Sequence, residues 1–227
     1  MIATAVFAVW PYIALTIFVV GHIWRWRFDQ FGWTTRTSEL MEKRWLMWAS
    51  PIFHVGVLLA VGGHAMGLLI PASATSAVGI DEHMYHRIAI AGGVLAGAVM
   101  LLGFALLVIR RFVARTRLRL VTVRADVVMY ILVGIVALLG MTATVGWGMF
   151  GGGYDYRATV AIWLRSVFYL HPQVALMAGA PLIYQVHGAM AFTVFAIWPF
   201  TRLVHLWSVP LAYLVRPPIV YQVSVAR

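Results

Sequence analysis

The chain has 227 residues, of which 63% are hydrophobic and only 11% are charged, and its mean hydropathy is +0.89. Soluble domains are roughly 45–50% apolar and about 25% charged, so this composition excludes a water-soluble globular protein and indicates a lipid bilayer as the solvent. The net charge of +10 comes from basic residues between the apolar stretches, where they set membrane topology, so it does not indicate a nucleic-acid partner.

Five stretches lack Asp, Glu, Lys and Arg and exceed the roughly 20 residues that a helix needs to cross the hydrocarbon core. In chain order they predict helices at about 3–23, 50–70, 86–109, 127–149 and 182–207. No stretch alternates like a barrel strand, and helices satisfy their own backbone groups in lipid. The sequence therefore predicts an all-α integral membrane protein, a five-transmembrane-helix bundle that forms one domain over 1–227.

The basic residues are distributed unevenly between the two sides of this bundle. Fourteen of the 17 Lys and Arg residues follow the first, third or fifth helix, and only Arg87, Arg157 and Arg165 lie on the other side. The positive-inside rule then places the N-terminus outside, in the periplasm, and the C-terminus in the cytoplasm. Met1 is followed by apolar residues without a basic n-region, so the first helix is expected to be retained.

Histidine is the only ionisable residue type well inside the predicted helices, and such residues are costly enough in a membrane to indicate function. His54 and His64 lie on the second helix, and His187 and His205 lie on the fifth. Because these helices are antiparallel, His54 and His205 share a level near the cytoplasm, and His64 and His187 share a level near the outer face. Two facing imidazoles supply the axial ligands of a six-coordinate haem iron.

The spacing of the four histidines differs between the two helices. His187 and His205 are eighteen residues apart, about 27 Å in a straight helix, whereas His54 and His64 are ten apart, about 15 Å. We therefore expect the helices to cross at an angle, Pro199 to bend the fifth helix, and the haem planes not to be parallel. Small residues beside the ligands are expected to leave room for a macrocycle: Gly56, Gly62, Gly63, Gly67, Gly188 and Ala189.

Hydrogen bonding and the binding of another metal are the alternatives to haem ligation at these histidines. A single intramembrane histidine can form a hydrogen bond to a neighbouring helix, but two pairs at matching depths favour haem. Another metal is disfavoured because the predicted helices contain no carboxylate and the chain contains no cysteine. The lack of cysteine also excludes disulfides, cysteine-ligated iron–sulfur clusters and c-type haem attachment, so any haem is held without a covalent bond.

Two stretches carry a family resemblance. FHVGVLLAVGGHAMG in the second helix and VHGAMAFTVFAIWPFTRLVHLWSVPLAYL near the end closely resemble the gamma (cytochrome b) subunit of membrane-bound respiratory nitrate reductase. The resemblance implies a multi-pass subunit of the bacterial or archaeal cytoplasmic membrane that binds two non-covalent b haems. It implies that His54 and His205 bind the inner haem and that His64 and His187 bind the outer haem.

The resemblance also implies a reaction and partners. A quinol, either menaquinol or ubiquinol, would be oxidised near the outer haem, and its electrons would pass inward to an iron–sulfur beta subunit. A molybdenum alpha subunit, also on the cytoplasmic side, would then reduce nitrate. The resemblance thus implies that the chain is a subunit of a quinol:nitrate oxidoreductase and that nitrate is not reduced on this chain.

One departure from the family concerns the quinol site. Some members place a lysine before the third helix, whereas the only lysine here is Lys43, on the cytoplasmic side. The corresponding stretch reads IDEHMYHRIA, in which His86 or His83 could take the proton role, since histidine titrates near neutrality. Alternatively, both are solvated loop histidines. Gly63, next to His64, is expected to let a quinone ring approach the haem edge.

Two rival functions remain. The same di-haem subunit could serve a sulfite-reductase-linked or heterodisulfide-type complex, and the subunits that co-purify would decide. A transporter with structural histidines is the more remote alternative, because the sequence has no inverted repeat, no paired broken helices and no carboxylate relay.

Overall fold

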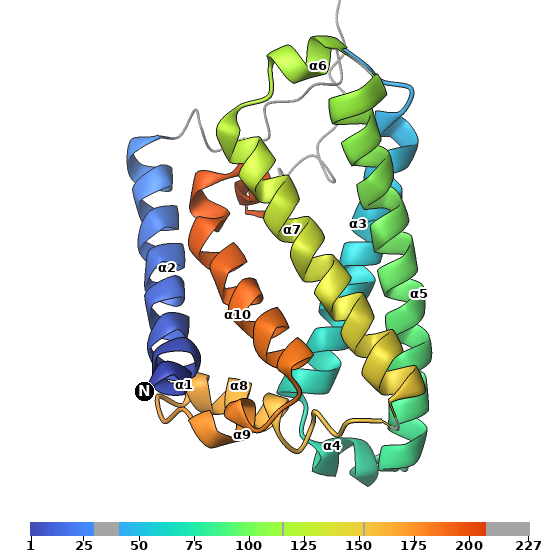
Figure 1. Cartoon of the computed structure of the whole chain (residues 1–227), viewed down its shortest axis with the longest axis vertical. Helices are drawn as coiled ribbons and strands as arrows, with labels where there is room; N and C mark the ends of the chain where they lie inside the picture. Colours follow the sequence, from blue (N-terminus) through green and yellow to red (C-terminus); the bar gives the residue numbers. More distant parts are fainter. Residues whose placement is uncertain (30–40, 115, 152, 208–227) are drawn as a thin grey trace, which may run out of the picture.

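The computed structural model describes residues 1–29, 41–114, 116–151 and 153–207, and within these ranges the regular elements are all helical (Figure 1). The predicted all-helical class and the presence of five long apolar helices are confirmed. Four cations that bear on the topology lie outside the described residues: Arg36, Arg115, Arg216 and Arg227. The helices long and apolar enough to span a membrane are Ile2–Phe28, Leu46–Leu69, Glu82–Val113, Arg124–Phe150 and Leu182–Phe200.

The first span consists of α1 (Ile2–Thr4), the π-helical turn η1 (Ala5–Val9) and α2 (Trp10–Phe28). Pro11, near the start of α2, cannot offer a backbone N–H to the carbonyl of Phe7 four residues earlier. The indole Nε1–H of Trp163 donates to that carbonyl instead, at 2.9 Å. The π turn beside Pro11 is therefore stabilised by a hydrogen bond from Trp163, a residue far away in the sequence.

Three further spans begin as α-helices and end in a π-helical turn. They are α3 (Leu46–His64) with η3 (Ala65–Leu69), α5 (Glu82–Val108) with η4 (Ile109–Ala114), and α7 (Arg124–Thr142) with η5 (Ala143–Phe150). Because α3 begins before the predicted start at 50, Pro51 lies inside the helix rather than in its first turn. Asp81 caps α5 by accepting the backbone N–H of Met84 at 2.7 Å, so that helix also begins earlier than predicted.

Glycines set the closest helix contact in the bundle. A Cβ added at Gly56 of α3 would overlap the backbone of Met100, and one added at Gly103 of α5 would overlap the backbone of Phe53. The α3 and α5 backbones therefore touch through small residues, as is common between membrane helices. The fifth span, α10 (Leu182–Ile197), packs between α2 and α7 on the other side of the bundle (Figure 1).

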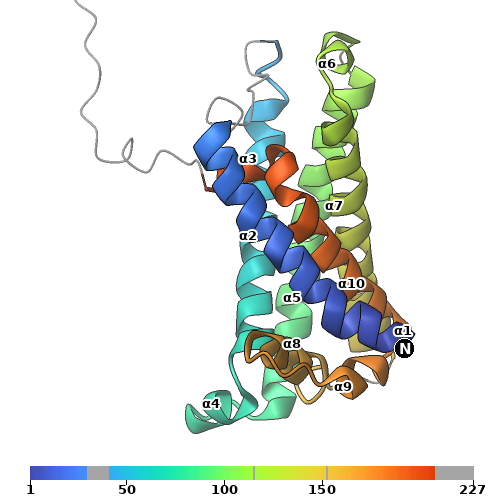
Figure 2. The same cartoon turned by 90° about the vertical axis from the view of Figure 1, so that its left-hand side faces the viewer.

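The two ends of the bundle differ. The short helices α4 (Ala72–Ala77), α8 (Val160–Phe168) and α9 (Val174–Ala178) lie at the end that holds the N-terminus, and α6 (Thr116–Leu120) lies at the other end (Figures 1 and 2). The segment between the fourth and fifth spans is thus partly helical. The main buried cluster gathers where the first and fifth spans meet α8 and α9, and includes Phe7, Ala14, Trp163, Val167, Met177 and Phe192.

The end of the fifth span differs from its prediction. The sequence predicts a continuous helix over 182–207 with a bend at Pro199, but α10 stops at Ile197 and a 3-10 turn, η6 (Trp198–Phe200), follows. Thr201 is extended (φ −122°, ψ 179°) before a second 3-10 turn, η7 (Arg202–Leu206). Pro199 lacks an N–H and clashes with the preceding helical turn, so the α-helix is interrupted at this point.

Candidate functional site

The structure brings His54 and His205 together near the end of the bundle that carries α6. Nε2 of His54, on α3, lies 3.4 Å from Nε2 of His205, on η7. The ring centroids are 5.8 Å apart and the ring planes meet at 74°. The break after Pro199 allows this meeting, because it carries His205 off the axis of α10. We call these two residues the inner pair.

His64 and His187 face each other at the other level. Their ring centroids are 5.9 Å apart and their planes are inclined by only 26°, so the rings are nearly parallel. His64 closes α3 and His187 lies within α10. We call these two residues the outer pair. The mismatch in spacing along the two helices is absorbed by the broken end of the fifth span.

Backbone carbonyls fix the tautomer of three of the four rings. Nδ1 of His54 lies 2.7 Å from the carbonyl oxygen of Ser50, and Nδ1 of His64 lies 2.7 Å from that of Ala60. Nδ1 of His205 lies 2.5 Å from the carbonyl oxygen of Arg202. A carbonyl only accepts, so Nδ1 must carry the proton in each ring, and the lone pair is left on Nε2. This is the arrangement that metal-ligating histidines adopt.

His187 is held differently. Its Nδ1 is buried and has no hydrogen-bond partner among the described residues. The ring lies against Gly140 of α7, where an added Cβ would come within 3.1 Å of Cε1 of His187. A glycine at this position therefore makes room for the imidazole.

The glycines beside the ligands differ in the space that they leave. A Cβ at Gly62 or Gly63 would meet no atom within 4 Å, so the chain is open beside His64. The space beside Gly56 is instead occupied by the backbone of α5. Gly67 is filled by the ring of Tyr156, and Gly188 faces the Met177 side chain. Neighbouring backbone or side chains thus occupy the space beside these three glycines, so the expectation of a macrocycle beside them is wrong.

The two pairs suit a metal that needs only two protein ligands. Within the described ranges, no three His, Asp or Glu side chains are grouped so that they could hold a metal. Metal–imidazole bonds are roughly 2 Å long, so two ligands on opposite sides of one metal stand about 4 Å apart. The 3.4 Å between the inner-pair nitrogens is close to that value, and a small outward movement of either ring would reach it. An iron whose remaining ligands belong to a porphyrin fits this donor set.

Residues 3–224 match the family described as nitrate reductase gamma subunit. The chain belongs to the nitrate reductase gamma subunit family. It is 44% identical over 212 residues to the nitrate reductase gamma chain of Bacillus subtilis, covering 93% of this chain and 94% of that protein. It is 31% identical over 222 residues to the respiratory nitrate reductase 1 gamma chain of Escherichia coli, covering 97% and 96%.

A higher identity links the chain to a longer protein. It is 50% identical over 216 residues to the nitrate reductase-like protein NarX of Mycobacterium tuberculosis, covering 93% of this chain but only 32% of that protein. The chain thus spans about a third of the length of these relatives. Family membership and the five apolar spans together make it a multi-pass membrane protein.

The residues expected at the quinol site lie at the start of α5. His83 is exposed, whereas His86 is half-buried. Nε2 of His86 is enclosed without a hydrogen-bond partner among the described residues, and it lies against Gly153, which has a φ of +77°. A Cβ at Gly153 would come within 2.8 Å of this nitrogen. The two histidines therefore differ sharply in their surroundings, which the sequence did not indicate.

Arginines that the sequence marks only as topology signals form buried contacts. Arg165 donates to the carbonyl of Leu68 at 2.8 Å, and Arg157 donates to that of Ile70 at 3.3 Å, so both satisfy carbonyls at the end of the second span. Arg157 also pairs with Glu82 at 3.1 Å. These contacts fix the helix end that follows His64.

At the opposite end, Asp126 of α7 accepts hydrogen bonds from Arg111 at 2.8 Å and from Nε and Nη2 of Arg202. All three side chains lie at the boundary of a span. An aspartate at the start of an apolar stretch, with two arginines at the same predicted level, is the sequence signal that could have found this cluster.

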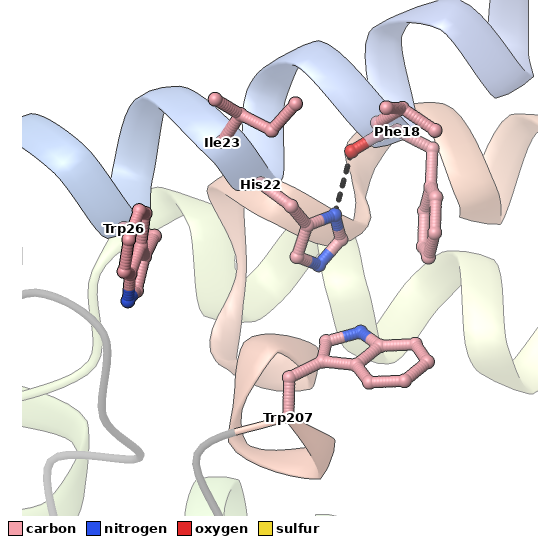
Figure 3. Close-up of a pocket in the computed structure, with 6 residues that line it drawn as sticks. Phe18, His22, Ile23, Trp26 and Trp207 are labelled. Atoms are coloured by element: carbon pink, nitrogen blue, oxygen red, sulfur yellow. Dashed lines mark hydrogen bonds between the residues drawn. The ribbon is translucent and has the colours of Figure 1, made fainter.

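His22 has no place in either pair. Nδ1 of His22 donates to the carbonyl of Phe18 at 2.6 Å, and the ring lies between the Phe18 and Trp207 rings, with centroids 4.3 and 6.1 Å away (Figure 3). These side chains line an open hollow of about 360 Å³ on the outside of the bundle. The hollow lies between α2 and Trp207 at the end of η7, and none of the four paired histidines lines it.

Proposed function

We propose that the chain is a single di-haem transmembrane domain that serves as the quinol-oxidising membrane subunit of a respiratory nitrate reductase. One observation carries the proposal: two Nε2 atoms of the inner pair face each other at 3.4 Å, while both Nδ1 atoms point at carbonyls. Two lone pairs repel at this distance unless an electron-pair acceptor lies between them. A proton there would put a charged imidazolium inside the apolar bundle, which is costly, whereas a haem iron meets the need without it.

The chain's own residues hold and orient the two groups. His54 and His205 would ligate one haem b, and His64 and His187 would ligate the other. The Nδ1–H bonds of His54, His64 and His205 keep the Nε2 of these three rings free to bind. The open space at Gly62 and Gly63 would admit the outer macrocycle, and Gly140 would leave room for the His187 ring. When bound, bis-histidine haems supply one-electron transfer and leave no site for oxygen chemistry.

The direction of the reaction follows from the proposed topology. The positive-inside rule supports a periplasmic N-terminus and a cytoplasmic C-terminus, so the inner pair faces the cytoplasm. Menaquinol or ubiquinol would be oxidised near the outer pair, with Gly63 admitting the ring and His86 or His83 accepting a proton. The electrons would leave on the cytoplasmic side to an iron–sulfur beta subunit and a molybdenum alpha subunit that reduces nitrate. The names of the Bacillus and Escherichia relatives support nitrate as the terminal acceptor.

A reduced-minus-oxidised spectrum of the purified full chain tests the haem proposal. We expect a b-type α-band and two haems per chain. His54→Ala and His64→Ala should each remove one haem, whereas His171→Ala, a matched change at an exposed outer histidine, should remove none. A chain without a b-type band, or single variants that both keep two haems, would contradict the proposal.

The nitrate assignment needs a separate measurement. The complex is purified through this chain, its subunits are identified, and quinol-dependent nitrate reduction is assayed. Iron–sulfur and molybdenum subunits with nitrate activity support the proposal. Co-purification of a sulfite- or heterodisulfide-reducing subunit instead would overturn it while leaving the di-haem role in place.

A further inference from the structure

We propose that Asp126, at the start of α7, is a positioning residue for the inner ligand His205. The inference rests on the proposed function, because it concerns a ligand of one of the two proposed haems. It assigns a role to a buried carboxylate that touches neither the ligand ring nor the iron. The link between Asp126 and the ring is the residue Arg202.

His205 needs support that the other three ligands do not. His54 and His64 belong to α3 and His187 lies within α10, so regular α-helix holds their backbones. His205 lies on η7, a 3-10 turn separated from α10 by the extended residue Thr201. Short 3-10 turns have poorer hydrogen-bond geometry than α-helices. The position of this ligand therefore depends on contacts outside its own turn.

Arg202 supplies such a contact, because its side chain and its backbone carbonyl both form hydrogen bonds. Its Nε and Nη2 both donate to the carboxylate of Asp126, with Nη2 at 3.0 Å from Oδ2. Its backbone carbonyl accepts the Nδ1–H of His205 at 2.5 Å. A two-point guanidinium–carboxylate bond fixes direction as well as distance. Anchoring the side chain of Arg202 thus anchors the carbonyl that orients the ligand ring.

Asp126 is itself held rigidly. Its side chain is only 2% exposed, and Oδ2 also accepts Nη2 of Arg111 at 2.8 Å and the backbone N–H of Val123 at 3.2 Å. Arg111 comes from η4, so the carboxylate joins the ends of the third, fourth and fifth spans. Without its charge, the buried Arg111 and the partly buried Arg202 would face each other as two cations and would repel. The turn that carries His205 would then no longer be held in a fixed position relative to the other spans.

Substitution of Asp126 by Asn tests this in the full chain, purified in detergent with any subunits that accompany it. Unmodified protein and His54→Ala first establish the ferric low-spin signal of each haem by electron paramagnetic resonance. If the unmodified chain has no b-type haem, the proposed function fails, which is a result distinct from any outcome for Asp126. With both haems present, Asp126→Asn should keep the outer low-spin signal. The inner signal should decrease, high-spin ferric iron should appear, and haem affinity at the inner site should fall roughly tenfold, as on losing a ligand's supporting partner.

Asp29→Asn is the matched control. It makes the same chemical change at the same end of the bundle, in the i,i+4 pair with Arg25, where the Asp29 side chain is 40% exposed. Both haem signals should stay unchanged, because ion pairs that remain partly exposed contribute little.

Arg202→Lys provides a second route should Asp126→Asn fail to accumulate. It keeps the positive charge but loses the two-point grip, so it should give the same inner-site signature in weaker form. Retention of a fully low-spin inner haem in both variants would overturn the proposal. So would an equal loss of both haems, which would mark Asp126 as a general packing residue.

Discussion

The indole Nε1–H of Trp163 donates a hydrogen bond to the carbonyl oxygen of Phe7 at 2.9 Å. This bond joins α8, which lies between the fourth and fifth spans, to the π turn of the first span. It occurs where Pro11 cannot provide the helical N–H, and the Trp163 side chain is almost fully buried beside the Phe7 ring. The Trp163 side chain thus satisfies a carbonyl of the first span that lacks its helical partner, and it holds α8 against the bundle.

Trp163→Phe should lower the free energy of unfolding by about 1–3 kcal/mol, because it removes a buried donor while keeping an aromatic ring. Thermal unfolding of the detergent-purified chain measures the effect. Trp24→Phe, at an exposed position of α2, is the control and should leave the transition unchanged. Equal transitions for all three proteins would show that the Trp163–Phe7 bond contributes nothing to stability.

Gly140→Val should displace the His187 ring and decrease the amount of the haem that we propose at the outer pair. The Cβ alone would lie 3.1 Å from Cε1 of His187, and the branched side chain adds further overlap. Overpacking of this kind costs roughly 1–3 kcal/mol. The reduced-minus-oxidised spectrum should lose its outer component and keep its inner one. Gly146→Val, on the same span but with its nearest contact at 4.0 Å, is the control, and an outer haem equally intact in both variants would count against the packing argument.

His86→Ala should slow quinol oxidation roughly a hundredfold while both haems remain, if His86 is the proton acceptor of the proposed quinol site. His83→Ala should have little effect, since His83 is exposed whereas Nε2 of His86 is enclosed beside Gly153. The rate of haem reduction by added quinol, followed by stopped-flow absorbance, separates the two variants. Unchanged rates in His86→Ala would remove this residue from the site.

Glu42 should give the stability of the bundle a pH dependence at the end that carries α6. Burial by itself raises the pKa of the Glu42 carboxyl, but the N–H of Trp45 at 2.8 Å and the guanidinium of Arg110 at 2.6 Å outweigh it and lower the pKa. A carboxyl with a lowered pKa in the folded state adds stability above its ordinary pKa and loses it as the pH falls through the folded-state pKa. The unfolding temperatures of the chain and of Glu42→Gln should therefore differ most near neutral pH and converge in acid. A difference that does not change with pH would contradict this. Asp29→Asn, in a partly exposed pair, should have little effect on the unfolding temperature.

The sequence predicted the spans well because lipid imposes one strong requirement, a long apolar stretch without charge. It also predicted which histidines would meet, since level in the membrane follows from helix direction alone. The ends of the helices were predicted less well. Asp81 caps α5 and Pro51 lies inside α3, because local capping and packing extend helices beyond their apolar stretches.

The remaining features depend on contacts that no local pattern encodes. Pro199 indicated an irregularity, but whether the chain bends or breaks depends on whether something holds the next turn, and Asp126 does so from another span. Gly56, Gly63 and Gly140 look alike in the sequence, yet one admits a helix backbone, one faces open space and one admits an imidazole. These roles follow from the neighbours that packing brings, so only the three-dimensional structure separates them.

The pairing of α3 with the fifth span has a consequence for biogenesis. His54 and His205 are 151 residues apart in the chain, and the partner of His64 is His187, on the similarly late helix α10. A nascent chain that has inserted four spans presents only single imidazoles to the lipid, so neither pair can form before the last span enters the membrane. Loading of the two proposed haems would thereby be tied to the completion of synthesis, and a prematurely terminated chain would not become a partly active electron carrier.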